Sequence, residues 1–482
     1  MTIPQYVSGF VLLLNIILAF IVVFQERRDA GATWAWLLVM LFVPILGFVL
    51  YLLLAQNLSR VRIFKWEDLN QSGIDGKLEA QSAELIAGRF PFRNTRTKDR
   101  SDLIYMHLIN NRALFTENNS VELFTDGREK FERLLEDIRE AREFIHLQYY
   151  IIRSDNLGRR LLSALTERVR EGVKVRILYD ELGSRTLSRG FFREYKAAGG
   201  EVEAFFPSKL RIINTRLNYR NHRKLVVIDG RIGYTGGFNV GDEYLGLHPK
   251  FGYWRDTHLR IRGDAVHDLQ ARFILDWNHA SHRHDIVYDP DLFPQEGVPG
   301  STGMQIVTSG PDSELEHIKY GYIKMINSAQ HTIWIQTPYF IPDASLLDAL
   351  RVACLSGIEV NIMIPDKPDH MFVYWATLSH IGEMLNLGAN VYIYRNGFIH
   401  AKTLVIDDAV ASVGTANIDV RSFRLNFEVN AFMYDGEIAR KLTDLYREDM
   451  KVSTRLTLDD YRNRPRRIRV KESISRLLSP IL

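Results

Sequence analysis

Residues 222–239 read His-Arg-Lys-Leu-Val-Val-Ile-Asp-Gly-Arg-Ile-Gly-Tyr-Thr-Gly-Gly-Phe-Asn, and residues 400–417 read His-Ala-Lys-Thr-Leu-Val-Ile-Asp-Asp-Ala-Val-Ala-Ser-Val-Gly-Thr-Ala-Asn. His, Lys, Asp, Gly and Asn recur at the same spacing in both stretches. The apolar, branched residues between Lys and Asp predict a buried strand that carries His and Lys at one end. A single His-x-Lys-x4-Asp match is a weak signal. Two copies with the same downstream Gly and Asn indicate an internal duplication.

Strands and helices precede both copies of the motif in the same order. The first half has strand patterns at 144–152, 172–180 and 200–206 and a helix pattern at 161–171. The second half has strand patterns at 332–341, 357–366 and 390–394 and a helix pattern at 346–356. Strands that alternate with helices of this length predict parallel strands with crossover helices. We therefore predict an α/β protein with two duplicated α/β sandwich halves, whose histidines meet in one active-site cleft.

The paired motifs resemble those of the phospholipase D superfamily over about residues 120–450. This resemblance implies phospholipase D-like halves and phosphodiester chemistry through a covalent phosphohistidine, with no metal or other cofactor. The residue types fit such chemistry, because a neutral imidazole can attack phosphorus while an imidazolium protonates the leaving alkoxide. By analogy His222 is the nucleophile and His400 is the acid and then the base, although the sequence itself does not distinguish the two.

The other repeated polar residues complete the expected site. Fixed donors must stabilise the charge that develops on the phosphate oxygens. The candidates are Lys224 and Lys402 as catalytic lysines and Asn239 and Asn417 as phosphate-binding residues. Asp229 and Asp407, the last residues of the motifs, are counted with the catalytic set and are expected to brace the motif strands and the lysines.

Each imidazole also needs a partner on its second nitrogen, which fixes the tautomer and stabilises the cation. Acidic residues follow both motifs, Asp256 in Tyr-Trp-Arg-Asp-Thr and Glu428 in Asn-Phe-Glu-Val-Asn. The resemblance implies that these two carboxylates hold His222 and His400. The alternative is that they pair with surface arginines.

Two uncharged runs near the N-terminus, 6–24 and 34–55, are each long enough to cross a hydrocarbon core of ~30 Å as a helix. No Lys or Arg precedes Arg27 and a second run follows, which argues against a cleaved signal peptide. We predict a transmembrane hairpin with helices at about 5–24 and 34–55. A slight excess of basic residues after the second span favours a cytoplasmic catalytic part.

The predicted organisation has five parts. They are the hairpin at 1–58, a linker at 59–120 with a helix near 77–86 that packs on the first half, the first half at 121–295, the second half at 296–450 and a basic tail at 451–482. The end of the tail, 462–482, mixes Arg and Lys with Ile and Leu. It is expected either to lie on a membrane surface as a basic amphipathic segment or to be a solvated end with some apolar docking.

Charge and cysteine content add further limits. The net charge of +3 on 482 residues says little about partners. Six basic residues gather at the first motif and either face anionic headgroups or form an ordinary solvated face: Lys209, Arg211, Arg216, Arg220, Arg223 and Lys224. Cys354 is the only cysteine, which excludes an intrachain disulfide and a Cys-based metal site.

Within the superfamily, two N-terminal membrane spans followed by one pair of motif halves resemble the bacterial cardiolipin synthases. Matching stretches include Asn221-His-Arg-Lys224, Ser309-Gly-Pro-Asp312 and Thr337-Pro-Tyr-Phe340. The resemblance implies a multi-pass protein of the bacterial cell membrane that transfers a phosphatidyl group between two phosphatidylglycerol molecules, giving cardiolipin and glycerol. The implied partners are phosphatidylglycerol and anionic membrane lipids, without nucleic acid.

Three other functions stay open. A hydrolytic phospholipase D or another phosphatidyltransferase would use the same residues, a superfamily nuclease would use the same two histidines, and a membrane scaffold would use neither. The nuclease is disfavoured because the basic run has few of the interleaved aromatic residues that stack on bases. The range of acceptor alcohols and the oligomeric state are not specified by the sequence.

Overall fold

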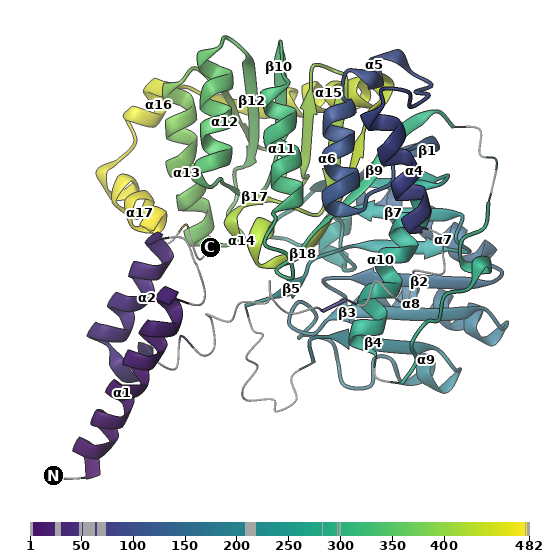
Figure 1. Cartoon of the computed structure of the whole chain (residues 1–482), viewed down its shortest axis with the longest axis horizontal. Helices are drawn as coiled ribbons and strands as arrows, with labels where there is room; N and C mark the ends of the chain where they lie inside the picture. Colours follow the sequence, from purple (N-terminus) through teal and green to yellow (C-terminus); the bar gives the residue numbers. More distant parts are fainter. Residues whose placement is uncertain are drawn as a thin grey trace.

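The computed structural model describes residues 3–24, 30–47, 51, 63–64, 74–207, 218–281, 283–295, 297, 300–477 and 479. Figure 1 shows two α/β halves side by side, with a pair of N-terminal helices set apart from them. Three residues of the expected basic cluster, Lys209, Arg211 and Arg216, lie outside the described residues.

The N-terminal helices α1 (Ile3–Phe24) and α2 (Ala30–Phe42) pack against each other. The Asn15 side chain of α1 donates a hydrogen bond to the Pro44 carbonyl at 3.0 Å. Within the described residues, no helix is long and apolar enough to cross a membrane. The second expected span, 34–55, extends into residues outside the described part of the chain.

Three helices occupy the segment that was predicted to be a linker: α4 (Ile74–Ile86), α5 (Thr95–Lys98) and α6 (Ser101–Asn111). Helix α4 contains the helix expected near 77–86. The linker prediction otherwise needs correction, because α6 buries Leu103 and Ile104 in the core of the second half. The Gln305 side chain also donates a hydrogen bond to the Ile104 carbonyl at 3.0 Å. Helix α6 is therefore part of the folded body.

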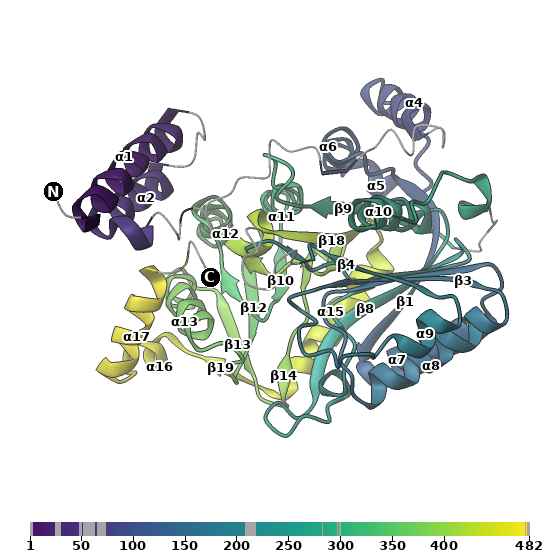
Figure 2. The same cartoon turned by 90° about the horizontal axis from the view of Figure 1, so that it is seen from below.

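The first half is a mixed sheet with helices on both faces. Its elements are β1 (Thr116–Asp126), α7 (Gly127–Glu140), β2 (Phe144–Tyr149), α8 (Asn156–Arg170), β3 (Lys174–Asp180), α9 (Arg193–Ala197), β4 (Glu201–Phe205), β5 (Arg220–Asn221), β6 (Leu225–Ile228), β7 (Ile232–Gly236), η2 (Asp242–Leu245), β8 (Trp254–Arg262) and α10 (Ala265–Ala280). The strand order is β4-β3-β2-β6-β7-β8-β1, and the pairs from β4 to β2 are parallel. In Figure 2, α7, α8 and α9 cover one face and α10 covers the other.

The second half repeats this plan. Its elements are η3 (Pro290–Leu292), β9 (Thr302–Ser309), α11 (His317–Asn327), β10 (Thr332–Gln336), β11 (Phe340–Ile341), α12 (Ala344–Leu355), β12 (Glu359–Pro365), α13 (Met371–Asn386), β13 (Asn390–Tyr394), β14 (Phe398–Ile399), β15 (Thr403–Ile406), β16 (Val410–Gly414), β17 (Ile418–Asp419), α14 (Val420–Arg424), β18 (Asn426–Met433), α15 (Gly436–Lys451) and β19 (Ser453–Leu456). The strand order is β19-β13-β12-β10-β15-β16-β18-β9, with parallel pairs from β13 to β10. The predicted duplication and parallel crossover strands are confirmed.

The two halves share strands and core. Strand β1 pairs with β8 on one edge and with β9 of the second half on the other. One cluster of buried side chains combines residues of β8, α10, β9, β18 and α15. Its members include Leu259, Val266, Met304, Val429 and Leu442. Because this apolar surface is removed from water only when the halves meet, the hydrophobic effect holds them in a fixed relation.

The chain ends in α16 (Leu458–Arg462) and α17 (Arg466–Leu477), which pack against α13. The start of α16 is fixed by a capping box, in which Thr457 and Asp460 satisfy each other's backbone amides. The end of the tail is therefore helical over Arg466–Leu477.

Candidate active site

Each motif histidine follows a two-residue strand that pairs with the other half of the molecule. Strand β5 pairs with β18, and the His222 amide donates to the Phe427 carbonyl at 2.9 Å. Strand β14 pairs with β8, and the His400 amide donates to the Arg255 carbonyl at 2.7 Å. The backbone of each half therefore fixes the position of the other half's histidine.

The imidazoles and the carboxylates meet crosswise. Nδ1 of His222 lies 2.9 Å from both carboxylate oxygens of Glu428, which belongs to the second half. Nδ1 of His400 lies 2.6 Å from Oδ2 of Asp256, which belongs to the first half. Both carboxylates are fully buried, so the alternative pairing with surface arginines is not observed.

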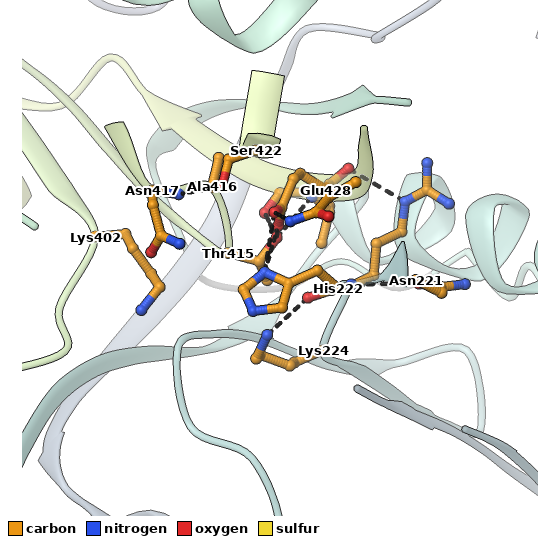
Figure 3. Close-up of polar contacts among 12 residues, drawn as sticks. Asn221, His222, Lys224, Lys402, Thr415, Ala416, Asn417, Ser422 and Glu428 are labelled. Carbon is orange, nitrogen blue, oxygen red and sulfur yellow. Dashed lines mark hydrogen bonds and ion pairs between the residues drawn. The ribbon is translucent and has the colours of Figure 1, made fainter. Parts of the chain in front are cut away.

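A carboxylate at Nδ1 favours the proton on that nitrogen and leaves the lone pair on Nε2. Among the described residues, no protein group is hydrogen-bonded to Nε2 of either ring. In Figure 3, the edge of His222 that points away from Glu428 faces the space beside Lys224, Lys402 and Asn417. The open nitrogen is thus directed at a set of possible phosphate-binding groups.

Burial lowers the pKa of the His222 imidazole, although Glu428 opposes the effect. Burial and the charge of Lys402 lower the pKa of His400 to about 4. Burial alone would raise the pKa of the two carboxyls, but the histidines and lysines outweigh it and both carboxyls have lowered pKa values. Both rings are therefore neutral near pH 7 beside ionised carboxylates.

The two lysines lie beneath the histidines and are buried. Lys224 Nζ donates to the His222 carbonyl at 2.7 Å, and Lys402 Nζ donates to the His400 carbonyl. Burial lowers the pKa of Lys224 to about 7 and that of Lys402 to about 8. Lys402 contributes to the lowered pKa of His222, and Lys224 contributes to that of His400. The four groups therefore act within one site.

The two orienting carboxylates are held differently. Thr415 Oγ1 donates to Glu428 at 2.5 Å, and the Asn426 side chain donates to it at 3.1 Å. Asp256 accepts from the Thr257 amide at 2.8 Å. At the repeat position that corresponds to Thr415 stands Gly237, where an added Cβ would lie 1.8 Å from Asp256 Oδ1. Only glycine leaves room for this carboxylate.

The two motif asparagines also differ. Asn239 Oδ1 accepts from the Ile151 amide at 3.1 Å, and its Nδ2 donates to the Tyr244 hydroxyl at 3.2 Å. Its amide is occupied by contacts within the first half. Asn417 Oδ1 is buried without a hydrogen-bond partner, and the side chain lies next to Lys402 in Figure 3. Among the described residues, Nδ2 of Asn417 donates no hydrogen bond, so of the two asparagines Asn417 is the one that keeps an N–H donor for a phosphate oxygen.

Asp229 and Asp407 lie away from the site. Each carboxylate accepts three backbone N–H groups at 2.7–2.9 Å, Asp229 from residues 142–144 and Asp407 from residues 330–332. They follow strands of four residues, which places them about 13 Å from the histidine ends. Both brace strand starts, but the expected contact with the lysines is absent among the described residues. Their inclusion in the catalytic set stays a prediction.

Sequence reasoning missed a buried brace behind each histidine. In the first, Asp276 accepts hydrogen bonds from Arg223 at 2.7 and 2.8 Å and from Gln148 at 2.7 Å. Arg223 Nε also donates to the Glu428 carbonyl at 3.1 Å. The brace thus connects α10 to the residue that orients His222.

The second brace has the same form. Asp449 of α15 pairs with Arg255 at 2.8 Å and accepts from Gln336 at 2.8 Å. Arg255 also donates to the carbonyl of Asp256, the residue that orients His400. Gln148 and Gln336 occupy equivalent places in the repeated strands. A buried polar residue at the same place in both copies was the signal that could have revealed the braces.

The basic cluster of the first motif is not a surface patch over the residues described. Arg223 and Lys224 are 1% and 0% exposed and point into the brace and the site. Arg220 is half-buried and donates to the Tyr219 carbonyl at 2.8 Å. The expectation that these side chains form a solvated face is therefore wrong for Arg223 and Lys224.

A duplicated α/β sandwich, in which two His-carboxylate pairs and two lysines meet at the junction of the halves, defines the phospholipase D-like class. A family model described as cardiolipin synthase, PLD-like domain, matches residues 134–273 and 322–450. A second model, described as phospholipase D-nuclease N-terminal, matches residues 13–56.

Full-length relatives specify the family. The major cardiolipin synthase ClsA of Bacillus subtilis (strain 168) is 65% identical over 482 residues, which cover 100% of both chains. The cardiolipin synthase of Oceanobacillus iheyensis is 55% identical over 482 residues, again 100% of both chains. The chain belongs to the cardiolipin synthase family.

Among solved structures, the phosphatidylserine synthase of Haemophilus influenzae Rd KW20 superimposes with a TM-score of 0.61 at 15% identity. The match covers 81% of this chain and 100% of that one. At this level of identity the likeness concerns the fold alone.

Proposed function

We propose that this chain is a cardiolipin synthase, which transfers the phosphatidyl group of one phosphatidylglycerol molecule to a second one and releases glycerol. The observation that carries the proposal is the pair of crossed His-carboxylate contacts, with both Nε2 atoms open toward two buried lysines. Family membership and full-length identity to cardiolipin synthases support the same reaction.

In the first half-reaction, Nε2 of His222 attacks the phosphorus of a phosphatidylglycerol. The bond between phosphorus and the headgroup glycerol breaks, and protonated His400 donates its Nε2 proton to the departing oxygen. Glu428 stabilises the positive charge on the phosphorylated His222. Lys224, Lys402 and the open amide of Asn417 stabilise the charge on the phosphate oxygens.

The acid in this step is His400, whose pKa is lowered to about 4 by burial and the charge of Lys402. A bound phosphodiester adds a negative charge beside the ring, and a nearby negative charge favours the imidazolium. Substrate binding therefore raises the pKa of His400 toward the value that an acid needs. His400 therefore takes up its proton when the anionic lipid binds.

In the second half-reaction, a hydroxyl of the second phosphatidylglycerol gives its proton to His400 and attacks phosphorus. The P–N bond to His222 breaks, cardiolipin forms, and His400 is again protonated for the next cycle. Water would compete at this step and give phosphatidic acid, so transfer requires a site that admits lipid and excludes water.

We also propose that residues 5–24 and 34–55 anchor the protein as a multi-pass hairpin in the bacterial cell membrane, with the catalytic part on the cytoplasmic side. Helix α1 has 22 residues and exposes apolar side chains such as Phe10, Leu13 and Phe20. Water-exposed apolar surface of this kind is costly, whereas hydrocarbon would cover it. The Asn15 contact to Pro44 satisfies a polar side chain between the helices.

The proposed reaction is tested with the purified full-length protein and phosphatidylglycerol alone in mixed micelles, with a chelator and without nucleotides. We expect equal amounts of cardiolipin and glycerol. An exposed-histidine variant, His248→Ala, serves as the control that keeps activity. Phosphatidic acid as the main lipid product would instead identify a hydrolytic phospholipase D.

A further inference from the structure

Helix α17 (Arg466–Leu477) is amphipathic, but it is packed with its polar side inward. Glu472 and Ser475 are buried, whereas Val470, Ile474 and Leu477 are 57%, 52% and 81% exposed. Glu472 has a partner inside, because Arg464 donates to its carboxylate from Nε at 2.9 Å and from Nη2 at 2.5 Å. A surface helix normally buries its apolar stripe. The described residues therefore leave the apolar stripe of α17 uncovered.

The charges of α17 border this stripe. A helix turns by about 100° per residue, which places Val470, Ile474 and Leu477 opposite Glu472 and Ser475. By the same turn, basic residues flank the stripe on both sides. Arg467 and Lys471 lie on one side, and Arg469 and Arg476 lie on the other.

Three of the arginines have no acidic partner in the described part of the chain. Among the described residues, no carboxylate lies within 4.0 Å of Arg466, Arg467 or Arg469, and all three are exposed. Two neighbours do have contacts: Arg476 pairs with Glu383, and Lys471 Nζ lies 5.2 Å above the Trp375 ring. The cluster thus keeps unpaired positive charge next to exposed apolar side chains.

Helix α17 packs against α13, and Lys471 lies over Trp375, one turn after the start of α13. Met371 and Phe372 in the first turn of α13 are 51% and 57% exposed. They follow Asp369, which accepts a hydrogen bond from the Tyr339 hydroxyl and acts electrostatically on Lys402. Exposed apolar side chains therefore also occur at the start of α13, close in sequence to a carboxylate that influences the site.

We propose that α17, together with the first turn of α13, is a docking surface for an anionic bilayer. An apolar stripe between rows of Lys and Arg lets the side chains enter the headgroup region while the charges stay at the phosphates. A second copy of the same surface would place like charges against each other. The proposal rests on the membrane location proposed above and adds the segment that seats the catalytic part on the bilayer.

The test uses the full-length protein in lipid nanodiscs, with the single cysteine replaced by Cys354→Ala and a new one introduced by Ile474→Cys. An environment-sensitive fluorophore at position 474 should gain intensity and shift to the blue in discs that contain phosphatidylglycerol. In discs of phosphatidylcholine alone it should change little. A second label, introduced by Glu140→Cys on the exposed end of α7, should report water in both discs.

Charge is tested by a matched pair of variants. Arg466→Gln, Arg467→Gln and Arg469→Gln together should reduce the signal several-fold. Arg139→Gln, Arg142→Gln and Arg159→Gln remove the same charge from exposed positions of the first half and should leave it unchanged.

The other outcomes would overturn the proposal. A label at 474 that reports water in both discs means that no bilayer covers the stripe, and equal burial in both means that the basic flanks do not select anionic lipid. If the label at 474 is buried in detergent, and the extent of burial rises with protein concentration, a second copy of the protein covers the stripe. No turnover is needed, so the measurement is repeated with His222→Ala, and failure of the proposed reaction remains distinguishable.

Discussion

His222 and His400 lie in equivalent places of the two duplicated halves, but the groups around them differ in part. Both rings are placed by a short strand, oriented at Nδ1 by a carboxylate of the other half and supported by a Gln-Asp-Arg brace. They differ in the details: Thr415 and Asn426 hold Glu428, whereas Gly237 leaves room for Asp256. The shared features orient both imidazoles, and the differences fall on the groups that surround the two carboxylates.

The crossed arrangement implies that neither half alone contains a complete site. Each half contains a histidine and a carboxylate, but the pair it contains does not meet. Separation of the halves would leave both imidazoles without partners at Nδ1. The catalytic unit is therefore the junction of the halves, which a shared apolar core keeps rigid.

The largest expected difference between the halves concerns the asparagines. Asn417→Ala should lower kcat about 10²- to 10³-fold, because it removes an uncommitted donor from the developing phosphate charge. Asn239→Ala should chiefly lower the melting temperature, since its amide already bonds Ile151 and Tyr244. Steady-state kinetics and thermal unfolding of both variants separate the effects. Equal losses of kcat in the two variants would contradict the proposed difference between Asn417 and Asn239.

The substitution Gly237→Ala should disrupt the contact between Asp256 and His400 and leave the contact between Glu428 and His222 intact. Its Cβ would displace the carboxylate of Asp256 from Nδ1, and a displacement of about 1 Å can cost about 10²-fold in rate. Thr415→Ala, at the corresponding position of the other half, removes one hydrogen bond to Glu428 and should cost only several-fold. The ratio of the two kcat values measures the difference. A mild Gly237→Ala variant would mean that Asp256 does not position His400.

The braces should be equivalent in both halves. Asp276→Asn and Asp449→Asn each leave a buried arginine without its carboxylate, which costs about 3–5 kcal/mol of stability and shifts the orienting residue. Asp137→Asn is the matched control, because Asp137 is a buried partner of Arg260 outside the site. All three should unfold at lower temperature, but only the first two should lose kcat, by about 10-fold. A similar loss of kcat in the Asp137→Asn control would show that the two braces contribute to stability only and do not position the catalytic groups.

The smallest expected effect is a pH dependence shared by the two lysines. Their lowered pKa values, about 7 for Lys224 and about 8 for Lys402, mean that they carry charge below these values and lose it as pH rises. KM for an anionic lipid should therefore increase several-fold between about pH 6 and 9. Lys402→Arg keeps its charge at every accessible pH and should flatten the upper part of the profile. A KM that is constant with pH would show that neither lysine binds the substrate in its charged form.

The sequence was sufficient to predict the duplicated α/β fold and the motif histidines and lysines, because their pattern repeats along the chain. It did not indicate the crossing of the carboxylates. Which half supplies a partner depends on the pairing of β5 with β18 and of β14 with β8, and strands of two residues have no sequence signature. Spacing suggested correct residue types but not the partner of each one.

The aspartates show a second limit. Asp229 and Asp407 belong to the motif by spacing, so they were expected near the lysines. In the structure their carboxylates accept hydrogen bonds from the starts of neighbouring strands. Asp229 and Asp407 themselves have positive φ angles, 52° and 53°. Short polar side chains tolerate this conformation and hydrogen-bond nearby backbone amides. The regular spacing of Asp229 and Asp407 in the two motifs therefore reflects their hydrogen bonds to the starts of neighbouring strands, at the end of each motif strand that lies away from the histidine.

The central claim, that His222 is the nucleophile and His400 the acid and base, is tested most directly with a phosphatidyl ester of p-nitrophenol, which leaves without needing a proton. The His400→Ala variant should release a burst of about one nitrophenolate per enzyme and then stall, because no base activates the acceptor. The His222→Ala variant should give no burst. A burst from His222→Ala, or steady turnover by both variants, would contradict the account.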